Sequence, residues 1–324
     1  MTTRRKVVGG LIAAGAASVV RPVRAQTFPN RAVRIIVPFA PGGGADIVSR
    51  LMQPHLQQRL GQPVVVENRA GAAGRIGTGA VAKAEPDGHT LLVSTESSLA
   101  IAPHIGVSMT YEPLKDFAPV SLITRNTIML VVHPTVTVDT LQDYSAMARA
   151  KPGQLFYASS GVGGPNHLAG EIFNRMAKLD ITHVPFQGTG LALQAVISNQ
   201  VGAMWGFTAG LIPHIRGGAL KALAVGSVAR SAALPEVPTV AEAGVPGYEA
   251  TSWIGMVAPA GTPQPAIDTL WQAVDAAMRE KNVQDTVVGG GSDIVVSKPA
   301  EFRRVMEADD AKYAKLADLF KAAR

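Results

Sequence analysis

Glycine-rich turns carry the residue types and spacing best suited to chemistry in this chain. Residues 41–44 (Pro-Gly-Gly-Gly) and 159–168 (Ser-Ser-Gly-Val-Gly-Gly-Pro-Asn-His-Leu) each follow a predicted strand and lead into a predicted helix. A helix that begins at such a turn directs backbone N–H groups and the positive end of its dipole outward, where an anion can bind. Two such turns in separate α/β units favour a cleft that binds an anion. The alternative interpretation is that both are tight βα connections without a ligand, with Asp46 capping the first helix.

Neither the first turn nor a third glycine cluster fits a nucleotide site. The 41–44 turn lacks the Lys-Ser/Thr of a P-loop. Residues 77–82 match G-x-G-x-x-A, but the glycines of the 68–77 cluster begin several residues beyond the preceding strand. This cluster is therefore interpreted as a close-packing loop that leads into a helix.

The sequence contains none of the common hydrolase or metallopeptidase motifs. G-x-S-x-G, S-x-x-K with its companion motifs and H-E-x-x-H are absent, there is no Cys, and the seven His never fall four residues apart. His167 and His183 are interpreted as structural hydrogen-bonding residues, and no metal or cofactor is expected. A hydrolase with Ser97 or Ser160 as nucleophile is the alternative enzyme hypothesis, and it requires a neighbouring base that no motif supplies.

Composition indicates a folded protein of about two domains and excludes disorder and nucleic-acid binding. The 324 residues are 47% hydrophobic and 17% charged, the opposite of the disordered signature. Lys and Arg total 30 against 24 Asp and Glu, but five basic residues and no acidic ones lie in residues 1–25. The remaining 25 basic residues face 24 acidic ones, a balance unsuited to binding a phosphate backbone.

Residues 1–25 have the three regions of an export signal peptide. Residues 4–6 form the charged region, residues 7–20 the apolar region, and residues 23–25 a small-x-Ala cleavage site. The apolar run is too short to span a bilayer, which needs about 20 residues. Residues 3–8 also resemble a twin-arginine signal. We expect cleavage after residue 25 and an extracytoplasmic mature protein.

Short apolar strands alternate with helical patterns after the leader, which predicts βαβ units around a largely parallel sheet. The first series has strands at 33–39, 64–67 and 91–93, and a helix at 46–60 that Gly61 caps and Pro54 kinks. The second series has predicted strands at 128–132, 156–158, 182–185, 203–205 and 220–225, and helices from 139, at 166–177 and at 191–198. The last segment has a strand at 253–257 and helices at 265–281 and 299–323.

A series of short strings, almost end to end after the leader, resembles the substrate-binding receptors of tripartite tricarboxylate transporters, the Bug-type periplasmic proteins. The strings lie at 38–46, 66–71, 86–92, 117–120, 159–168, 183–188, 223–225, 234–239, 241–246 and 259–263. The resemblance implies an α/β fold of two Rossmann-like lobes, as in type II periplasmic binding proteins, with a ligand cleft between them. It places domain 1 at 27–127 plus 252–324 and domain 2 at 128–251.

The resemblance also implies a monomeric periplasmic receptor, without enzymatic activity, that captures a small organic carboxylate and delivers it to an integral-membrane permease. A ligand-sensing subunit of a signalling system is an alternative that shares the binding step. In such receptors the acid is held by backbone N–H groups, hydroxyls and ordered water rather than by an arginine clamp. The residues that inherit this role in domain 1 are Phe39, Ala40, Gly42, Gly43, Thr95, Glu96, Ser97 and Ser98. In domain 2 they are Ser159, Ser160, Gly161, Gly163, Phe186, Gly188 and Thr189.

Departures from the family pattern bear on the choice of ligand. Gly202 and Gly206 stand where relatives usually place aspartates, and Glu96 is an unusual acid beside the expected site. Trp205 lies between the two glycines, so we expect it to line the cleft and to favour a less polar or aromatic carboxylate. Because side chains alternate between the two faces of a strand, a place for Trp205 in the core of domain 2 is the alternative.

Overall fold

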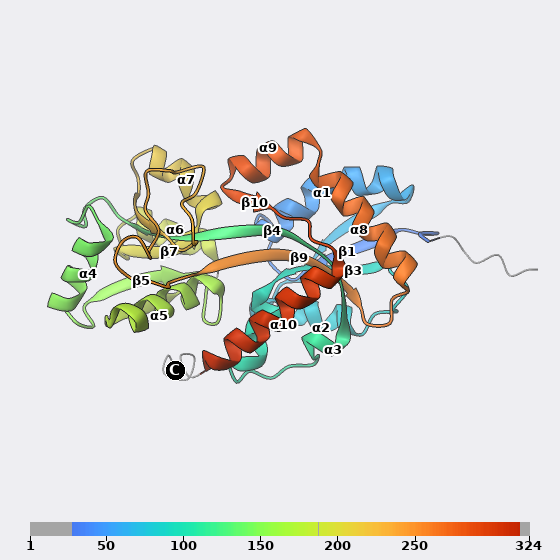
Figure 1. The fold of residues 1–324 in the computed structure, drawn as a ribbon, viewed down its shortest axis with the longest axis horizontal. Coiled ribbons are helices and arrows are strands. Elements are labelled where there is room, and N and C mark those ends of the chain that lie inside the picture. The colour runs from blue at the N-terminus through green and yellow to red at the C-terminus, as the bar shows by residue number, and fades with distance from the viewer. Residues whose placement is uncertain (1–27, 187, 318–324) are drawn as a thin grey trace, which may run out of the picture.

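The computed structural model describes residues 28–186 and 188–317, which form two α/β lobes side by side (Figure 1). In the first lobe β1 (Val33–Val37) lies between β2 (Val64–Asn68) and β3 (Thr90–Thr95) and is parallel to both. Helix α1 (Gly44–Leu60) follows β1, and α2 (Arg75–Ala82) connects β2 to β3. The C-terminal segment returns to this lobe as α8 (Gln264–Met278), α9 (Lys281–Gly289), β10 (Ser292–Ile294) and α10 (Pro299–Lys315).

The second lobe repeats the arrangement of its central strands. Strand β5 (Leu155–Ser159) lies between β6 (Ile181–Pro185) and β7 (Ala203–Phe207) and is parallel to both. Helix α5 (Pro165–Ala177) follows β5, and α6 (Thr189–Ile197) connects β6 to β7. The lobe is completed by α4 (Leu141–Ala150), α7 (Thr208–Arg216) and β8 (Lys221–Val225).

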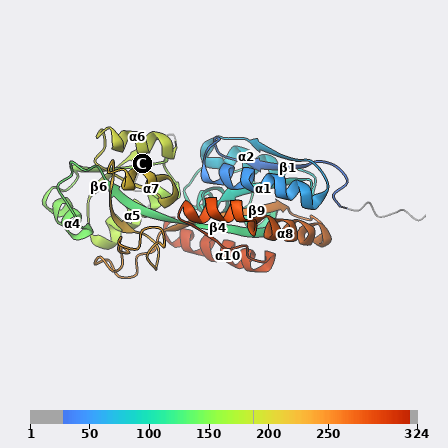
Figure 2. The same ribbon diagram turned by 90° about the horizontal axis from the view of Figure 1, so that it is seen from above.

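Two long strands run between the lobes, as Figures 1 and 2 show. They are β4 (Phe117–Val132), which follows the short helix α3 (Pro113–Asp116), and β9 (Thr251–Pro259). Over residues 117–127 β4 pairs with β9, and over residues 128–132 it pairs with β7 and β8. One sheet therefore continues through both lobes in the order β2-β1-β3-β9-β4-β7-β5-β6, with β8 and β10 paired to β4.

The expectation of a largely parallel sheet is correct within each βαβ unit and wrong at the crossing strands. Strand β9 is antiparallel to both β3 and β4, and β4 is antiparallel to β7 and β8. The sequence predicted only residues 128–132 of β4, because Pro119, Arg125 and Asn126 interrupt the apolar pattern of its first part. The structure also adds α7 and α9, which the sequence pattern did not separate from their neighbours.

Helix ends follow the predicted capping residues. Gly61 ends α1 in the left-handed conformation (φ +64°), and the helix continues through Pro54. Thr140 and Asp143 form a reciprocal capping box at the start of α4. In the first lobe, α1 and α8 bury Met52, Leu56 and Leu270 against the apolar residues of the sheet.

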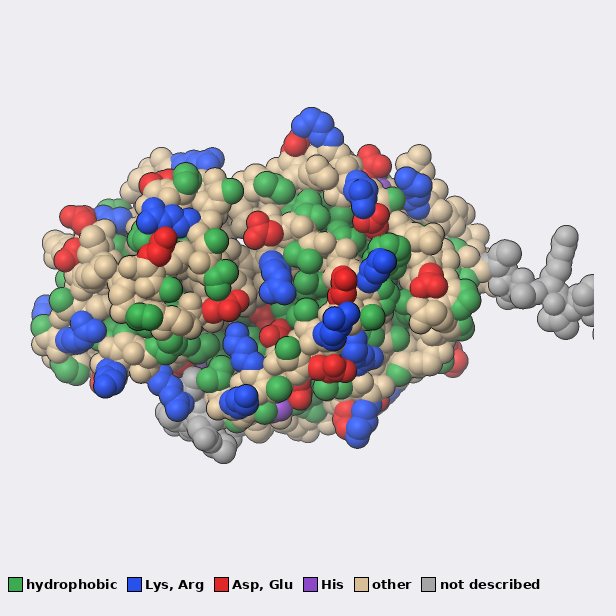
Figure 3. Space-filling view, in the orientation of Figure 1, with side chains coloured by type: hydrophobic (Ala, Val, Ile, Leu, Met, Phe, Trp, Pro, Cys, Tyr) green, Lys and Arg blue, Asp and Glu red, His purple; other side chains and the backbone are tan. Residues whose placement is uncertain are grey.

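The described surface carries side chains of both charges on the face drawn in Figure 3. Acidic and basic side chains are interspersed over that face, without a large area of one sign. Among residues 28–186 and 188–317, no helix has the length and apolar character needed to cross a bilayer. The predicted signal peptide lies outside the described residues.

Candidate functional site

The first-lobe turn between β1 and α1 is built around a glycine in the left-handed region. Gly42 has φ +83°, and its N–H donates a hydrogen bond to Asp46 Oδ2 at 2.9 Å. Asn68 and Arg50 both donate to the other carboxylate oxygen, also at 2.9 Å. Burial opposes ionisation of Asp46, but these donors outweigh it and hold the pKa of the carboxyl below its usual value. The ionised Asp46 thus fixes the turn, and Gly43 follows as the N-cap of α1.

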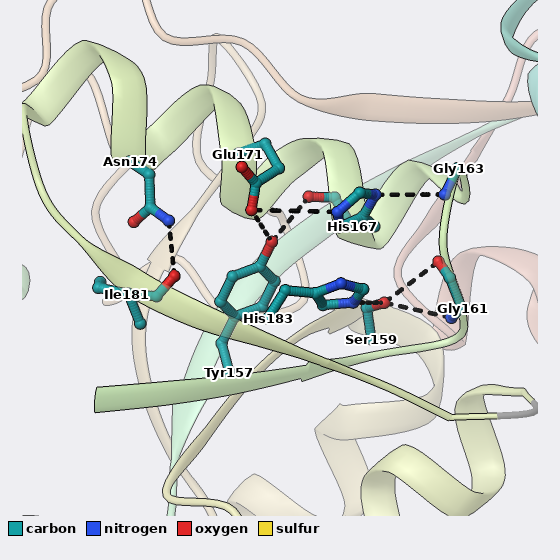
Figure 4. A network of polar contacts seen from close by, with 9 residues as sticks. All are labelled: Tyr157, Ser159, Gly161, Gly163, His167, Glu171, Asn174, Ile181 and His183. Atoms are coloured by element: carbon teal, nitrogen blue, oxygen red, sulfur yellow. Dashed lines mark hydrogen bonds and ion pairs between the residues drawn. The ribbon is translucent and has the colours of Figure 1, made fainter. Parts of the chain in front are cut away.

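The second-lobe turn between β5 and α5 has the same construction, with a histidine in place of the aspartate (Figure 4). Gly163 has φ +77°, and its N–H donates to His167 Nδ1 at 3.2 Å, again four residues further on. At the end of β5, Ser159 Oγ accepts the N–H of Gly161 at 3.2 Å and is hydrogen-bonded to His183 Nε2 at 2.6 Å. Polar side chains therefore hold both ends of this turn.

The two histidines of this network are stacked and neutral. Their ring centroids are 4.0 Å apart. Burial lowers the pKa of His167 to about 4, and burial together with the neighbouring His167 lowers the pKa of His183 to about 3. Because Nδ1 of His167 accepts the Gly163 N–H, its proton is on Nε2, 4.0 Å from Glu171 Oε1. The two histidines therefore supply no positive charge for an anion, whereas backbone N–H groups and the helix dipole do.

The two turns occupy equivalent places in their lobes. Each lies at the carboxyl end of the central strand, β1 or β5, where the strand order reverses and open α/β sheets bind their ligands. The helices that begin there have glycine N-caps, Gly43 for α1 and Gly164 for α5, with no side-chain cap. The first N–H groups of a helix lack intrahelical acceptors, and neither helix covers them with a capping side chain. Helix α5 begins with Pro165, which has no N–H, so its first donors are the N–H groups of Asn166 and His167.

The second-lobe turn also touches the first lobe. A Cβ atom at Gly163 would lie 2.7 Å from Ile105 Cδ1, so a side chain at this position would displace the first-lobe residue. Nearby, Ile101 packs with Leu168 of α5 and Tyr313 of α10 in one buried cluster. The lobes are therefore in contact beside the second-lobe turn.

Comparison with known proteins places this geometry in a family. A family model described as the tripartite tricarboxylate transporter family receptor matches residues 48–319. The chain belongs to this family. Protein BugT of Bordetella pertussis is 37% identical to this chain over 315 residues, which are 97% of this chain and 96% of BugT. The predicted family is confirmed, and its members are solute receptors rather than enzymes.

Two solved structures share the fold of the receptor. MatC (Rpa3494) from Rhodopseudomonas palustris with bound malate is 33% identical, with a TM-score of 0.83, over 90% of this chain and 100% of that one. Rpa4515 from R. palustris with adipate is 33% identical, with a TM-score of 0.85, over 91% of this chain and 98% of that one. The predicted two-lobed fold of a periplasmic binding protein is confirmed.

Gly74 lies close to two of the predicted first-lobe residues. A Cβ atom at Gly74 would lie 3.1 Å from the Phe39 ring and 3.4 Å from Ser98 Cβ, so the segment after β2 packs against the turn after β1 and the segment after β3. Thr95 Oγ1 accepts the N–H of Ser97 at 3.2 Å.

The second-lobe residues are gathered in a similar way. The N–H of Phe186 donates to the carbonyl of Ser159 at 3.1 Å, and a Cβ atom at Gly161 would lie 3.3 Å from the carbonyl oxygen of Phe186. Gly188, with φ +118°, is the N-cap of α6. The turn after β6 therefore lies beside the turn after β5.

Exposure divides the predicted set into three groups. Ala40 and Gly42 are exposed. The half-buried residues are Phe39, Gly43, Thr95, Ser160, Gly161, Phe186, Gly188 and Thr189, and the buried ones are Glu96, Ser97, Ser98, Ser159, Gly163 and Trp205.

Two of the buried residues point into the first lobe. Ser98 Oγ is hydrogen-bonded to Thr78 Oγ1 and Ser94 Oγ at 2.9 and 2.8 Å, and Glu96 Oε2 accepts hydrogen bonds from β9. The chain enters the short helix Ser97–Ile101 directly after β3, and the side chains of this helix face the interior. The side chains of Glu96 and Ser98 are therefore engaged within the first lobe, and contact of these two residues with the ligand stays a prediction.

Trp205 is a core residue, and the prediction that it lines the cleft is wrong. Its side chain is 1% exposed, and its ring centroid lies 5.7 Å from that of Tyr248 and 5.5 Å from that of Phe173. Gly206 makes room for Leu211 rather than for a ligand, because a Cβ atom there would lie 2.9 Å from Leu211 Cδ1. Trp205 therefore gives no reason to expect an aromatic carboxylate.

The structure gives no support to the hydrolase hypothesis. Within the described residues, no histidine is hydrogen-bonded to the hydroxyl of Ser97 or Ser160. The serine that meets a histidine is Ser159, whose side chain is buried. Burial also lowers the pKa of His183 to about 3, which makes this histidine a weak base.

Proposed function

We propose that this receptor binds a small organic carboxylate between its two lobes and delivers it to the integral-membrane permease of a tripartite tricarboxylate transporter. The observation that carries the proposal is the pair of glycine-capped helices, α1 and α5, at equivalent strand ends. Their first N–H groups and dipoles favour a negative group. The structures of relatives with malate and adipate support a carboxylate.

The ligand contacts are assigned to the exposed and half-buried residues of the four turns. Because the N–H of Gly42 is already bonded to Asp46, the donors of the first turn begin at Gly43. In the second lobe the contacts are assigned to Ser160, Gly161, Phe186, Gly188 and Thr189. The buried Ser159 shapes its turn through the bonds to His183 and Gly161, without touching the ligand.

The two lobes are proposed to close on the ligand as separate domains. The boundaries are residues 27–127 plus 252–324 for domain 1 and residues 128–251 for domain 2. The change of partner along β4 supports this division, because Thr127 pairs with β9 whereas Ile128 pairs with β7. Ligand contacts to both lobes favour the closed state by their differential affinity.

A thermal-shift screen of aliphatic and aromatic carboxylates, with malate and adipate among them, tests the ligand class. A bound carboxylate at about 100 times its Kd is expected to add roughly 2.7 kcal/mol to the free energy of unfolding. The uncharged amide of each active acid is the matched control and should give no shift. Equal stabilisation by acid and amide would contradict recognition of the carboxylate group.

Periplasmic location is proposed from the leader at residues 1–25, and it predicts the N-terminus of the mature protein. Edman sequencing of receptor isolated from the periplasm of the expressing cell should begin at Gln26. Replacing Arg4 and Arg5 by lysine should stop export only if the twin-arginine route is used. Periplasmic receptor that still begins at Met1 or Thr2 would show that the leader is not cleaved.

A further inference from the structure

Glu96 connects the first-lobe ligand turn to the strand that crosses between the lobes. It stands between Thr95, the last residue of β3, and Ser97. Its Oε2 accepts hydrogen bonds from Ser252 Oγ at 2.8 Å and from the Trp253 N–H at 3.1 Å. Both donors lie at the start of β9, next to the point where this strand enters the first lobe. The Glu96 carboxyl group therefore joins the segment after β3 to the start of β9, beside the direct pairing of β3 with β9.

The other oxygen of Glu96 is in an unusual position for a carboxylate. The side chain is fully buried, and Oε1 has no hydrogen-bond partner among the described residues. Burying an ionised oxygen without a partner is unfavourable, so the neutral acid is stabilised. Burial raises the pKa of Glu96 to about 7, although Ser252 and Trp253 partly offset it. The group therefore changes charge close to neutral pH.

We propose that Glu96 is a positioning residue that holds the ligand turn to β9 and makes the affinity for an anionic ligand fall as the pH rises. The inference rests on the proposed function, because it requires a negatively charged ligand. An ionised Glu96 places a buried charge one residue from the half-buried Thr95, one of the assigned ligand contacts, and repels a carboxylate bound there. Ligand binding therefore favours the protonated form and takes up a proton.

Other titratable groups near Glu96 lie on α10 and on the segment after β3. Asp309 accepts a hydrogen bond from the Trp253 indole at 2.6 Å, and burial raises the pKa of its carboxyl. Lys312, Arg125 and Glu249 act on Asp309 electrostatically, and Tyr313 is buried close to Glu96. His104 is hydrogen-bonded to Asp310 at 2.7 Å. The test therefore includes variants of Asp309 and His104.

The decisive measurement is the Kd for the most stabilising acid of the screen, by calorimetry at pH 6, 7 and 8. In the unaltered receptor the Kd is expected to rise up to about tenfold from pH 6 to pH 8. Glu96→Gln retains an oxygen for Ser252 and Trp253 but carries no charge, so its Kd should not change with pH. Glu96→Ala removes the hydrogen bonds to β9, and its Kd should be higher than that of Glu96→Gln at every pH.

The ligand-free protein provides a second measurement. Because the folded-state pKa of Glu96 exceeds its ordinary 4.5, its stabilising contribution is complete below about pH 4.5 and is lost as the pH rises through about 7. The Tm of Glu96→Gln should therefore exceed that of the unaltered receptor at pH 8 and approach it at pH 5. This comparison remains informative if Glu96→Ala does not fold.

Two control variants keep the assignment specific: His104→Asn and the exposed Glu85→Gln should retain the pH dependence of Kd. Asp309→Asn removes a carboxyl group that helps to raise the pKa of Glu96, so the rise of Kd should occur at lower pH in this variant. If Glu96→Gln binds the acid with an unchanged pH dependence, the inference is overturned and the proposed function stands. If no carboxylate binds at any pH, both are overturned.

Discussion

Trp205→Ala is expected to lower the free energy of unfolding by about 3–5 kcal/mol, the usual cost of truncating a large buried aromatic side chain. Trp205 is 1% exposed and contacts Phe173 and Tyr248 in the core of the second lobe. The loss should appear as a lower midpoint in urea unfolding followed by circular dichroism. The Kd of the folded protein for its carboxylate should be unchanged, because the indole does not line the turns.

The matched control is Trp205→Phe, which retains an aromatic ring beside Tyr248 and should lose clearly less stability than the alanine variant. If the alanine variant keeps its unfolding midpoint but binds the acid much more weakly, Trp205 contacts the ligand. The two outcomes separate a core residue from a ligand contact.

The face on which Trp205 lies could not be read from sequence, because its strand is buried on both faces. The indole packs in one core cluster of the second lobe, while the adjacent Met204 packs in another. Alternation distinguishes a core face from a solvent face only when one face is exposed. A central strand such as β7, paired with β4 and β5, provides no such contrast.

Local features of the site were predictable where a short-range rule governs them. Glycine at 42 and 163 supplies the positive φ of a tight strand-to-helix turn, and both turns lie where the sequence placed them. Contacts between distant segments were not predictable. Glu96 and Ser252 are 156 residues apart, and their hydrogen bond depends on the antiparallel pairing of β3 with β9. The role of Ile105 beside Gly163 likewise depends on how the lobes meet.

Substitution of Gly43 provides a direct test of the turn between β1 and α1. Gly43→Val is expected to raise the Kd for the carboxylate about 10- to 100-fold, because hydrogen bonds to a charged group contribute about 1.5–3 kcal/mol each. The branched side chain would occupy the space through which a carboxylate approaches the N–H groups at the start of α1. Calorimetry on the folded variant measures the effect.

The fold should tolerate this change. Gly43 has φ −76° and ψ 163°, which any residue adopts, and a Cβ atom there would meet only the Ala40 carbonyl oxygen, at 3.6 Å. The free energy of unfolding is therefore expected to stay within about 0.5 kcal/mol. Gly42, with φ +83°, does not offer such a clean substitution.

Gly289→Val is the matched control for Gly43→Val. Gly289 is exposed at the end of α9, and a Cβ atom there would meet nothing within 4 Å. The Gly289→Val substitution makes the same chemical change away from the two turns and should leave the Kd unaltered. If the folded Gly43→Val variant binds the acid as tightly as the control, the anion is not held by the start of α1. The site must then depend on the second-lobe turn and the N–H groups at the start of α5.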